Sequence, residues 1–256
     1  MIDAAVGIHC PVCAGRMREN AMSEAAYRAR TQLERTTVGR RLGTATATGA
    51  LIVLNVGIFV AMLFTGRPTS GRTLLRFGAL FDPLPRDEWW RLFTSMFVHI
   101  GIAHLLFNMF ALTLFGRAIE VRHGKARFIL LYLASGLSGA AASLAFTQGG
   151  IRAGASGGVF GILGAWIAFY LPYRHMRGAR QQLQSLLFLV GINLFFGFTV
   201  RGIDNGAHLG GLVAGFLIGS GLELARRATR PMPAAAPLGF ASVVLAAVLL
   251  ILPNTV

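Results

Sequence analysis

Seven apolar segments occupy most of this chain, and they restrict its fold more than any other feature of the sequence. They lie near residues 44–65, 99–117, 127–147, 156–172, 183–200, 206–225 and 237–252. Most are close to the ~20 residues that a helix needs to cross the hydrocarbon core of a bilayer. A segment in lipid must satisfy its own backbone hydrogen bonds, which favours helices. The sequence therefore predicts an all-α, polytopic membrane protein.

The composition argues against a soluble domain and against a nucleic-acid binder. The 256 residues are 54% hydrophobic and only 13% charged, and 32 of them are glycine, which is typical of tightly packed membrane helices. The formal charge is +14, but the basic residues fall in clusters between the apolar segments. Such clusters act as topology signals. We therefore expect the lipid bilayer, and no nucleic acid, as a partner.

The basic residues also predict an orientation. Residues 1–43 and the loops on their side of the membrane hold seventeen lysines and arginines, whereas the opposite side holds seven. The positive-inside rule then places the N-terminus in the cytoplasm and, with seven spans, the C-terminus outside. We expect a multi-pass protein of the cell (plasma) membrane.

Two segments flank the expected core. Residues 1–43 are polar and predict a cytosolic segment, partly helical around Glu19–Leu33. Cys10 and Cys13 resemble half of a zinc ribbon, but a structural zinc needs four ligands and the second pair is missing. We favour reduced, unliganded cysteines; a vestigial site, or one completed in an oligomer, is the alternative. Residues 226–256 are interpreted as a linker and the seventh helix.

The connection between the first two spans, residues 66–98, is unusually long and rich in aromatic residues such as Trp89 and Trp90. Tryptophans at the level of the lipid headgroups are typical of a loop that lies in the membrane interface. A disordered linker is the alternative, against which the density of aromatic residues argues.

Polar residues able to do chemistry concentrate in one half of the membrane. Three spans run from outside to inside and open with such residues, namely His99, His104 and Asn108 in the second, Ser156 in the fourth and His208 in the sixth. Ionisable groups inside a membrane are expensive and usually functional. Each has a structural alternative, because a single histidine or Asn108 can simply join two helices by a hydrogen bond.

The inner halves of the spans carry chiefly Glu120 and Glu223, which lie at span ends. Long side chains at such positions extend to the interface, and we attribute both glutamates to this snorkelling.

Glycines predict that the fourth and sixth spans touch. Ser156 lies between Gly154 and Gly157 at the start of one span, and Gly211 and Gly215 form a ridge in the other. Small residues four apart let two helices approach closely. A helix start also offers free N–H groups and a partial positive charge, which can stabilise an oxyanion beside a nucleophile.

Over roughly residues 50–225, the chain resembles the rhomboid family of intramembrane serine proteases. The motifs that carry the resemblance are Gly154-Ala155-Ser156-Gly157, Ala207-His208-x-x-Gly211-x-x-x-Gly215, His104-x-x-x-Asn108 with His99 before it, and Trp90-Arg91-x-x-Thr94-x-x-Phe97-x-His99. The resemblance implies a core of six transmembrane helices, residues 44–225, to which the seventh helix is added in a six-plus-one arrangement.

The resemblance also implies the roles of the site residues. Ser156 is the expected nucleophile and His208 its general base. His104, Asn108 and the backbone N–H of Ser156 are the expected oxyanion site. The family uses a Ser–His dyad, so no aspartate is needed, and Asp204 is interpreted as a loop residue.

Further residues match the family's motifs in supporting positions: His99, Gly154, Gly157, Gly211, Gly215, Trp90 and Arg91. Phe160 is a departure, because some relatives carry there a tyrosine that supports the histidine; stacking of the aromatic ring is the expected substitute. No cofactor or metal is implied.

The expected function is serine-type endopeptidase activity on transmembrane segments of membrane proteins, near the outer face. A catalytically inactive rhomboid-like protein that binds membrane clients is the first alternative, and a transporter is the second. A transporter would usually show internal repeats, and this sequence has none that we detect. The substrate and the oligomeric state stay open.

Overall fold

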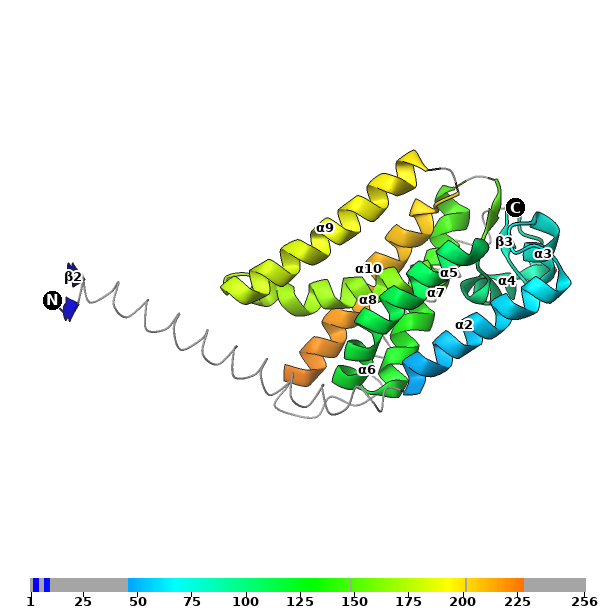
Figure 1. Ribbon diagram of the computed structural model, residues 1–256. Coiled ribbons are helices and arrows are strands. Elements are labelled where there is room, and N and C mark those ends of the chain that lie inside the picture. Colours follow the sequence, from blue (N-terminus) through cyan, green and yellow to red (C-terminus); the bar gives the residue numbers. More distant parts are fainter. Residues whose placement is uncertain (1, 5–6, 10–45, 148, 201, 228–256) are drawn as a thin grey trace. The chain divides into compact units, whose positions relative to one another are not determined.

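The computed structural model describes residues 2–4, 7–9, 46–147, 149–200 and 202–227 (Figure 1). The predicted half-site at Cys10 and Cys13, the helix near residues 19–33 and the seventh span all lie outside the described residues. The chain divides into two compact units, Met1–Thr44 and Ala45–Val256. In the first unit, β1 (Ile2–Ala4) pairs antiparallel with β2 (Gly7–His9).

Within the described part of the second unit, six helices are long and apolar enough to cross a membrane. They are α2 (Thr46–Thr65), α5 (Gly101–Ala111) continued by the π-helical turn η4 (Leu112–Gly116) and by α6 (Arg117–His123), α7 (Lys125–Phe146), α8 (Ser156–Tyr170) with the 3-10 turn η5 (Leu171–Tyr173), α9 (Arg177–Thr199) and α10 (Asn205–Arg227). The prediction of an all-α, polytopic membrane protein is confirmed. The second span extends to His123 and the fifth begins at Arg177, because helices continue through polar residues beyond the apolar segment.

The long connection between α2 and α5 is folded. It contains α3 (Gly71–Arg76), β3 (Leu80–Phe81), the 3-10 turns η2 (Arg86–Glu88) and η3 (Ser95–Phe97), and α4 (Arg91–Thr94). β3 pairs antiparallel with β4 (Ile151–Arg152), which lies just before α8. The alternative of a disordered linker is therefore wrong.

Arg91 holds this connection together. Its buried guanidinium donates hydrogen bonds to the carbonyl oxygens of Leu75 at 2.7 Å and Ala79 at 3.1 Å. It also stacks over the ring of Trp90, 4.4 Å from the ring centroid. Trp89 and Trp90 are both half-exposed, and their position in the membrane interface stays a prediction. These contacts give Trp90 and Arg91 a role in folding the loop.

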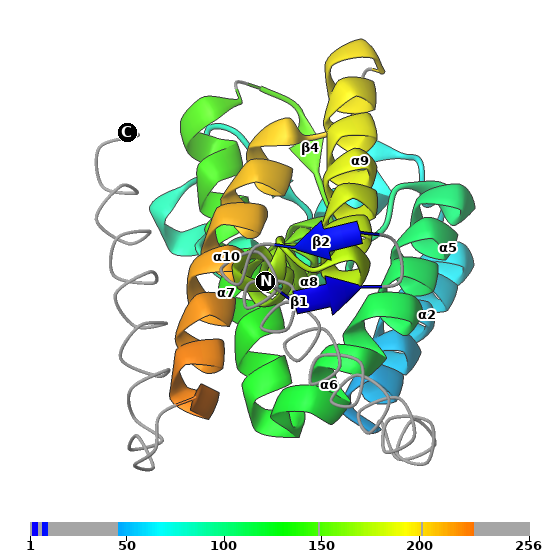
Figure 2. The same cartoon turned by 90° about the vertical axis from the view of Figure 1, so that its left-hand side faces the viewer.

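The centre of the second unit is the packing of α8 against α10, with α7 beside both; Figure 2 views α8 nearly along its axis. A Cβ atom added at Gly211 would lie 2.1 Å from the carbonyl oxygen of Gly157, and one at Gly215 would lie 2.0 Å from that of Gly161. The two backbones thus touch without side chains between them. The predicted contact of the fourth and sixth spans is confirmed.

The two glutamates at span ends do not snorkel, since both are 3% exposed. Glu120 accepts hydrogen bonds from the backbone N–H groups of Ala47 at 3.0 Å and Thr48 at 2.8 Å, so it caps the start of α2. Glu223 accepts two hydrogen bonds from Arg122, at 2.7 and 2.9 Å. The interpretation as snorkelling side chains was wrong because each carboxylate finds partners on another helix.

We predict that Gly215→Ala lowers the melting temperature by forcing α8 and α10 apart, with an effect of about 1–3 kcal/mol or more for overpacking a tight contact. Gly221→Ala is the matched control, because it lies on the same helix and a Cβ there meets nothing within 4 Å. The control should be neutral or stabilised by up to about 1 kcal/mol of helix propensity. Thermal melts of both variants in one detergent test this, and equal melting temperatures would contradict it.

Candidate active site

The loop that leads into α8 has one backbone conformation that only glycine adopts readily. Gly154 has φ +135°, and its N–H donates to the carbonyl oxygen of Ser95 at 2.9 Å. A Cβ at this position would also lie 2.5 Å from the ring of His104. The loop is thereby pressed against α5, and Ser156 follows as the first residue of α8.

Ser156 lies where a nucleophile would have electrostatic support. The first N–H groups of a helix lack partners within the helix and carry a partial positive charge. The residues after Ser156, from Gly157 to Ala165, are all buried. Ser156 itself is only partly buried.

His208 reaches this part of α8 through an aromatic contact. Its ring stacks on that of Phe160 with centroids 4.1 Å apart and planes 6° from parallel. Phe160 lies one helical turn after Ser156, and Gly211, one turn after His208, touches Gly157. The structure therefore brings the predicted serine and histidine to the same crossing of α8 and α10, and the expected stacking on Phe160 is present.

The Ser156 hydroxyl and the His208 ring are not hydrogen bonded to each other within the described residues. His208 is 8% exposed, and its Nδ1 has no hydrogen-bond partner in that part of the chain. Catalytic hydrogen bonds in enzymes without substrate are often long and tighten only when substrate binds. The pairing of the two side chains stays a prediction.

His104 and Asn108 lie beside the same loop. The ring of His104 covers Gly154, and its Nδ1 accepts the N–H of Ile100 at 3.4 Å. Asn108 is buried and donates from Nδ2 to the carbonyl oxygen of His104 at 2.9 Å. This hydrogen bond uses one of the two N–H groups of its amide, which leaves a second donor.

His99 packs against the same loop. It is fully buried, its ring meets that of His104 edge-on at 5.2 Å, and its Nε2 accepts the N–H of Ala155 at 3.5 Å. The ring is therefore neutral, because only an unprotonated ring nitrogen accepts a hydrogen bond.

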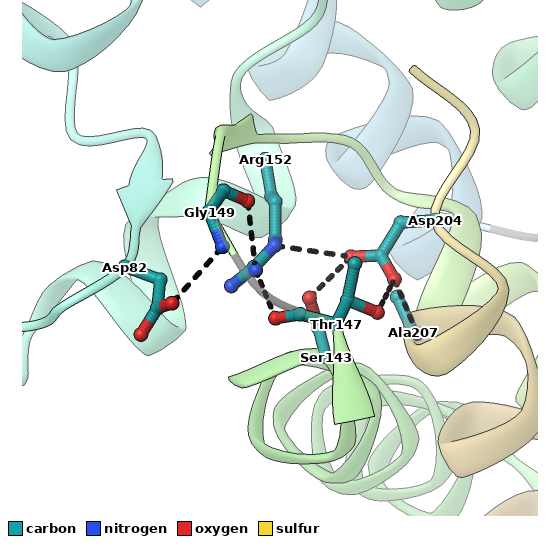
Figure 3. A network of polar contacts seen from close by, with 7 residues as sticks. All are labelled: Asp82, Ser143, Thr147, Gly149, Arg152, Asp204 and Ala207. Carbon is teal, nitrogen blue, oxygen red and sulfur yellow. Dashed lines mark hydrogen bonds and ion pairs between the residues drawn. The ribbon is translucent and has the colours of Figure 1, made fainter. Parts of the chain in front are cut away.

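Asp204 is more than a loop residue. Its Oδ1 accepts the N–H of Ala207 at 3.0 Å, so it is the N-cap of α10, one turn before His208 (Figure 3). Ser143 of α7 and Thr147, the residue directly after α7, also donate to this carboxylate. Sequence reasoning missed this role, although an aspartate directly before a predicted helix is a known N-cap signal.

Within the described residues, no three His, Cys, Asp or Glu side chains lie close enough to share a metal ion. The predicted site residues form two groups. The first group lies where α5, α8 and α10 meet, and it consists of Ser156, His208, His104, Asn108, His99, Phe160, Gly154, Gly157 and Gly211. Trp90 and Arg91 make their polar and stacking contacts inside the connection before α5, and Gly215 belongs to the helix packing.

Known proteins are similar in sequence to the part of the chain that contains these residues. A family model described as the Rhomboid domain matches residues 86–223. The rhomboid protease GluP of Bacillus subtilis is 43% identical over 183 residues, which are 71% of this chain and 36% of that protein. RHOMBOID-like protein 6, mitochondrial, of Arabidopsis thaliana is 34% identical over 212 residues, which are 69% of this chain and 68% of that protein. The chain thus spans about a third of the first relative (36%) and about two thirds of the second (68%).

Proposed function

Since the chain belongs to the rhomboid family, we propose that it is a serine endopeptidase that cleaves transmembrane segments of other proteins within the membrane. The observation that carries the proposal is the stacking of His208 on Phe160, one turn from Ser156, across the glycine contact of α8 and α10. GluP, which is 43% identical over the shared region, is named a rhomboid protease and supports the same activity.

In the proposed mechanism, His208 removes the proton of the Ser156 hydroxyl as its oxygen attacks a peptide carbonyl carbon. The tetrahedral intermediate collapses to an acyl-enzyme, and the leaving amine takes the proton from His208. A water molecule, deprotonated by the same histidine, then attacks the ester and releases the second product. The face of Phe160 orients the imidazole in place of a third hydrogen-bonding residue.

The negative charge that develops on the carbonyl oxygen needs donors. The N–H of Ser156 lies at the free start of α8, and the ring of His104 covers the residue two positions before the serine. Asn108 retains one amide N–H. We propose that these three groups form the oxyanion site, which acts mainly on the transition state.

The membrane restricts the substrates. A spanning helix has no free carbonyl, so it must unwind before a serine can attack it. We therefore propose substrates whose transmembrane segments carry glycine, proline or small polar residues near the cleavage site. We further propose that the site faces the outer half of a plasma membrane, with residues 1–43 cytosolic, residues 44–225 as the core and residues 226–256 as linker and seventh helix.

We predict that Ser156→Ala and His208→Ala each abolish cleavage of a model transmembrane substrate without lowering expression or the melting temperature appreciably. The hydroxyl and the imidazole are the reacting groups, whereas the helix contact depends on glycines that remain. A fluorophosphonate probe should label wild type and not Ser156→Ala. Cleavage by either purified variant would refute the dyad, and a wild type that neither cleaves nor reacts would favour the inactive, client-binding alternative.

We predict that His104→Ala and Asn108→Ala weaken catalysis without abolishing it. Loss of one oxyanion donor costs on the order of 10²–10³ in turnover, and the lower end is expected because other donors remain. The double variant should lose less than the product of the single losses, since both groups address one oxygen.

Turnover per probe-titrated serine, measured beside a melting curve, separates this role from helix packing. If the two residues only join helices, the melting temperature falls and turnover of the folded protein stays unchanged, which would remove both from the oxyanion site.

A further inference from the structure

The carboxylate of Asp204 joins three elements at one end of the helix bundle (Figure 3). It accepts hydrogen bonds from Ser143 and Thr147 at the end of α7, and from the N–H of Ala207 in α10. Its Oδ2 also lies 3.9 Å from Nε of Arg152 in β4. A single side chain thus contacts the segment before Ser156 and starts the helix that carries His208.

Arg152 is a buried cation that needs this partner. It is 7% exposed, and its Nη2 donates to the carbonyl oxygens of Thr147 and Gly149. Its Nε and Nη1 are buried without a hydrogen bond within the described residues. Asp204 is itself partly exposed, with 17% of its side chain accessible, but its removal would leave the buried charge of Arg152 uncompensated, which is costly.

Arg152 and Asp204 are connected to the candidate active site by their positions in the sequence. Arg152 lies four residues before Ser156, with Gly154 between them, and Asp204 lies four residues before His208. β4 ends at Arg152 and is paired with β3, and the residues that follow are held by hydrogen bonds from the N–H of Gly154 to Ser95 and from the N–H of Ala155 to His99. On the other side, α10 begins directly after Asp204.

We propose that the Arg152–Asp204 pair is a positioning device that sets the separation of Ser156 and His208. Both are positioning residues, since neither contacts a reacting atom. Asp204 is not a third member of a triad, because its carboxylate contacts Ser143, Thr147, Ala207 and Arg152, while Nδ1 of His208 has no hydrogen-bond partner in the described part of the chain. The inference rests on the proposed protease function.

The test uses Asp204→Asn in the full chain in detergent. Asparagine is as good an N-cap as aspartate, so the helix start is kept and the charge is lost. A small displacement of reacting groups can reduce catalysis about a hundredfold; we expect kcat per titrated serine to fall about ten- to a hundredfold with KM little changed. Arg152→Gln should act in the same direction, and the double variant should lose much less than the product of the two losses.

Arg122→Gln is the matched control. It breaks the ion pair with Glu223, which lies near the other end of α10 and is also buried. This variant should lower the melting temperature and leave kcat unchanged, whereas a purely structural role for Asp204 would make the two variants behave alike. If Asp204→Asn fails to fold because Arg152 is left unpaired, the double variant Arg152→Gln/Asp204→Asn carries the kinetic test.

The outcomes separate the two proposals. An active wild type with unchanged kcat in Asp204→Asn, or in the double variant if the single one does not fold, overturns the positioning device and leaves the protease function intact. A wild type that neither cleaves nor reacts with a fluorophosphonate overturns the protease function, and the device falls with it. Lowered kcat in the Asp204 and Arg152 variants, without a loss in Arg122→Gln, supports the inference.

Discussion

The structure depends on backbone contact between α8 and α10. Lipid is as apolar as the side chains of a membrane helix, so helices associate there through van der Waals packing and hydrogen bonds rather than through the hydrophobic effect. Gly157 and Gly161 meet Gly211 and Gly215 so closely that a single Cβ would collide with a carbonyl oxygen. This contact determines the spacing of the two helices, and that spacing lets Phe160 and the His208 ring stack at 4.1 Å.

Paired charges hold the helix ends to other parts of the chain. Asp204 at the start of α10 and Glu223 near its end both pair with an arginine from another element. Glu120 caps α2 from α6, and so closes a contact between parts of the chain that are more than 70 residues apart. Charges in a membrane protein are tolerated when they are paired inside the bundle. Here these pairs also fix how far each helix is shifted along its neighbours, which contacts between apolar surfaces alone would not determine.

The candidate site combines a loop that is held by several contacts with two side chains that are not hydrogen bonded to each other. The loop at Gly154 is fixed by Ser95, His104 and the neutral His99, which together leave it little freedom. By contrast, the hydroxyl of Ser156 and the ring of His208 are held near each other by their helices without a hydrogen bond between them. The candidate site is thus organised by the backbone geometry of its loop and helices.

Hydropathy, glycine spacing and motifs determined a great deal from the sequence alone. They predicted six of the spans in the described residues, the contact between α8 and α10, the stacking of Phe160 and the family. These features are local or repeat at helical intervals, so a sequence displays them directly. The catalytic roles of Ser156 and His208 stay predictions. Only the tertiary structure decided the partners of Glu120, Glu223 and Asp204 and the pairing of β3 with β4. Those partners lie tens of residues away, and which side chains meet depends on helix rotation and loop path, which hydropathy does not encode.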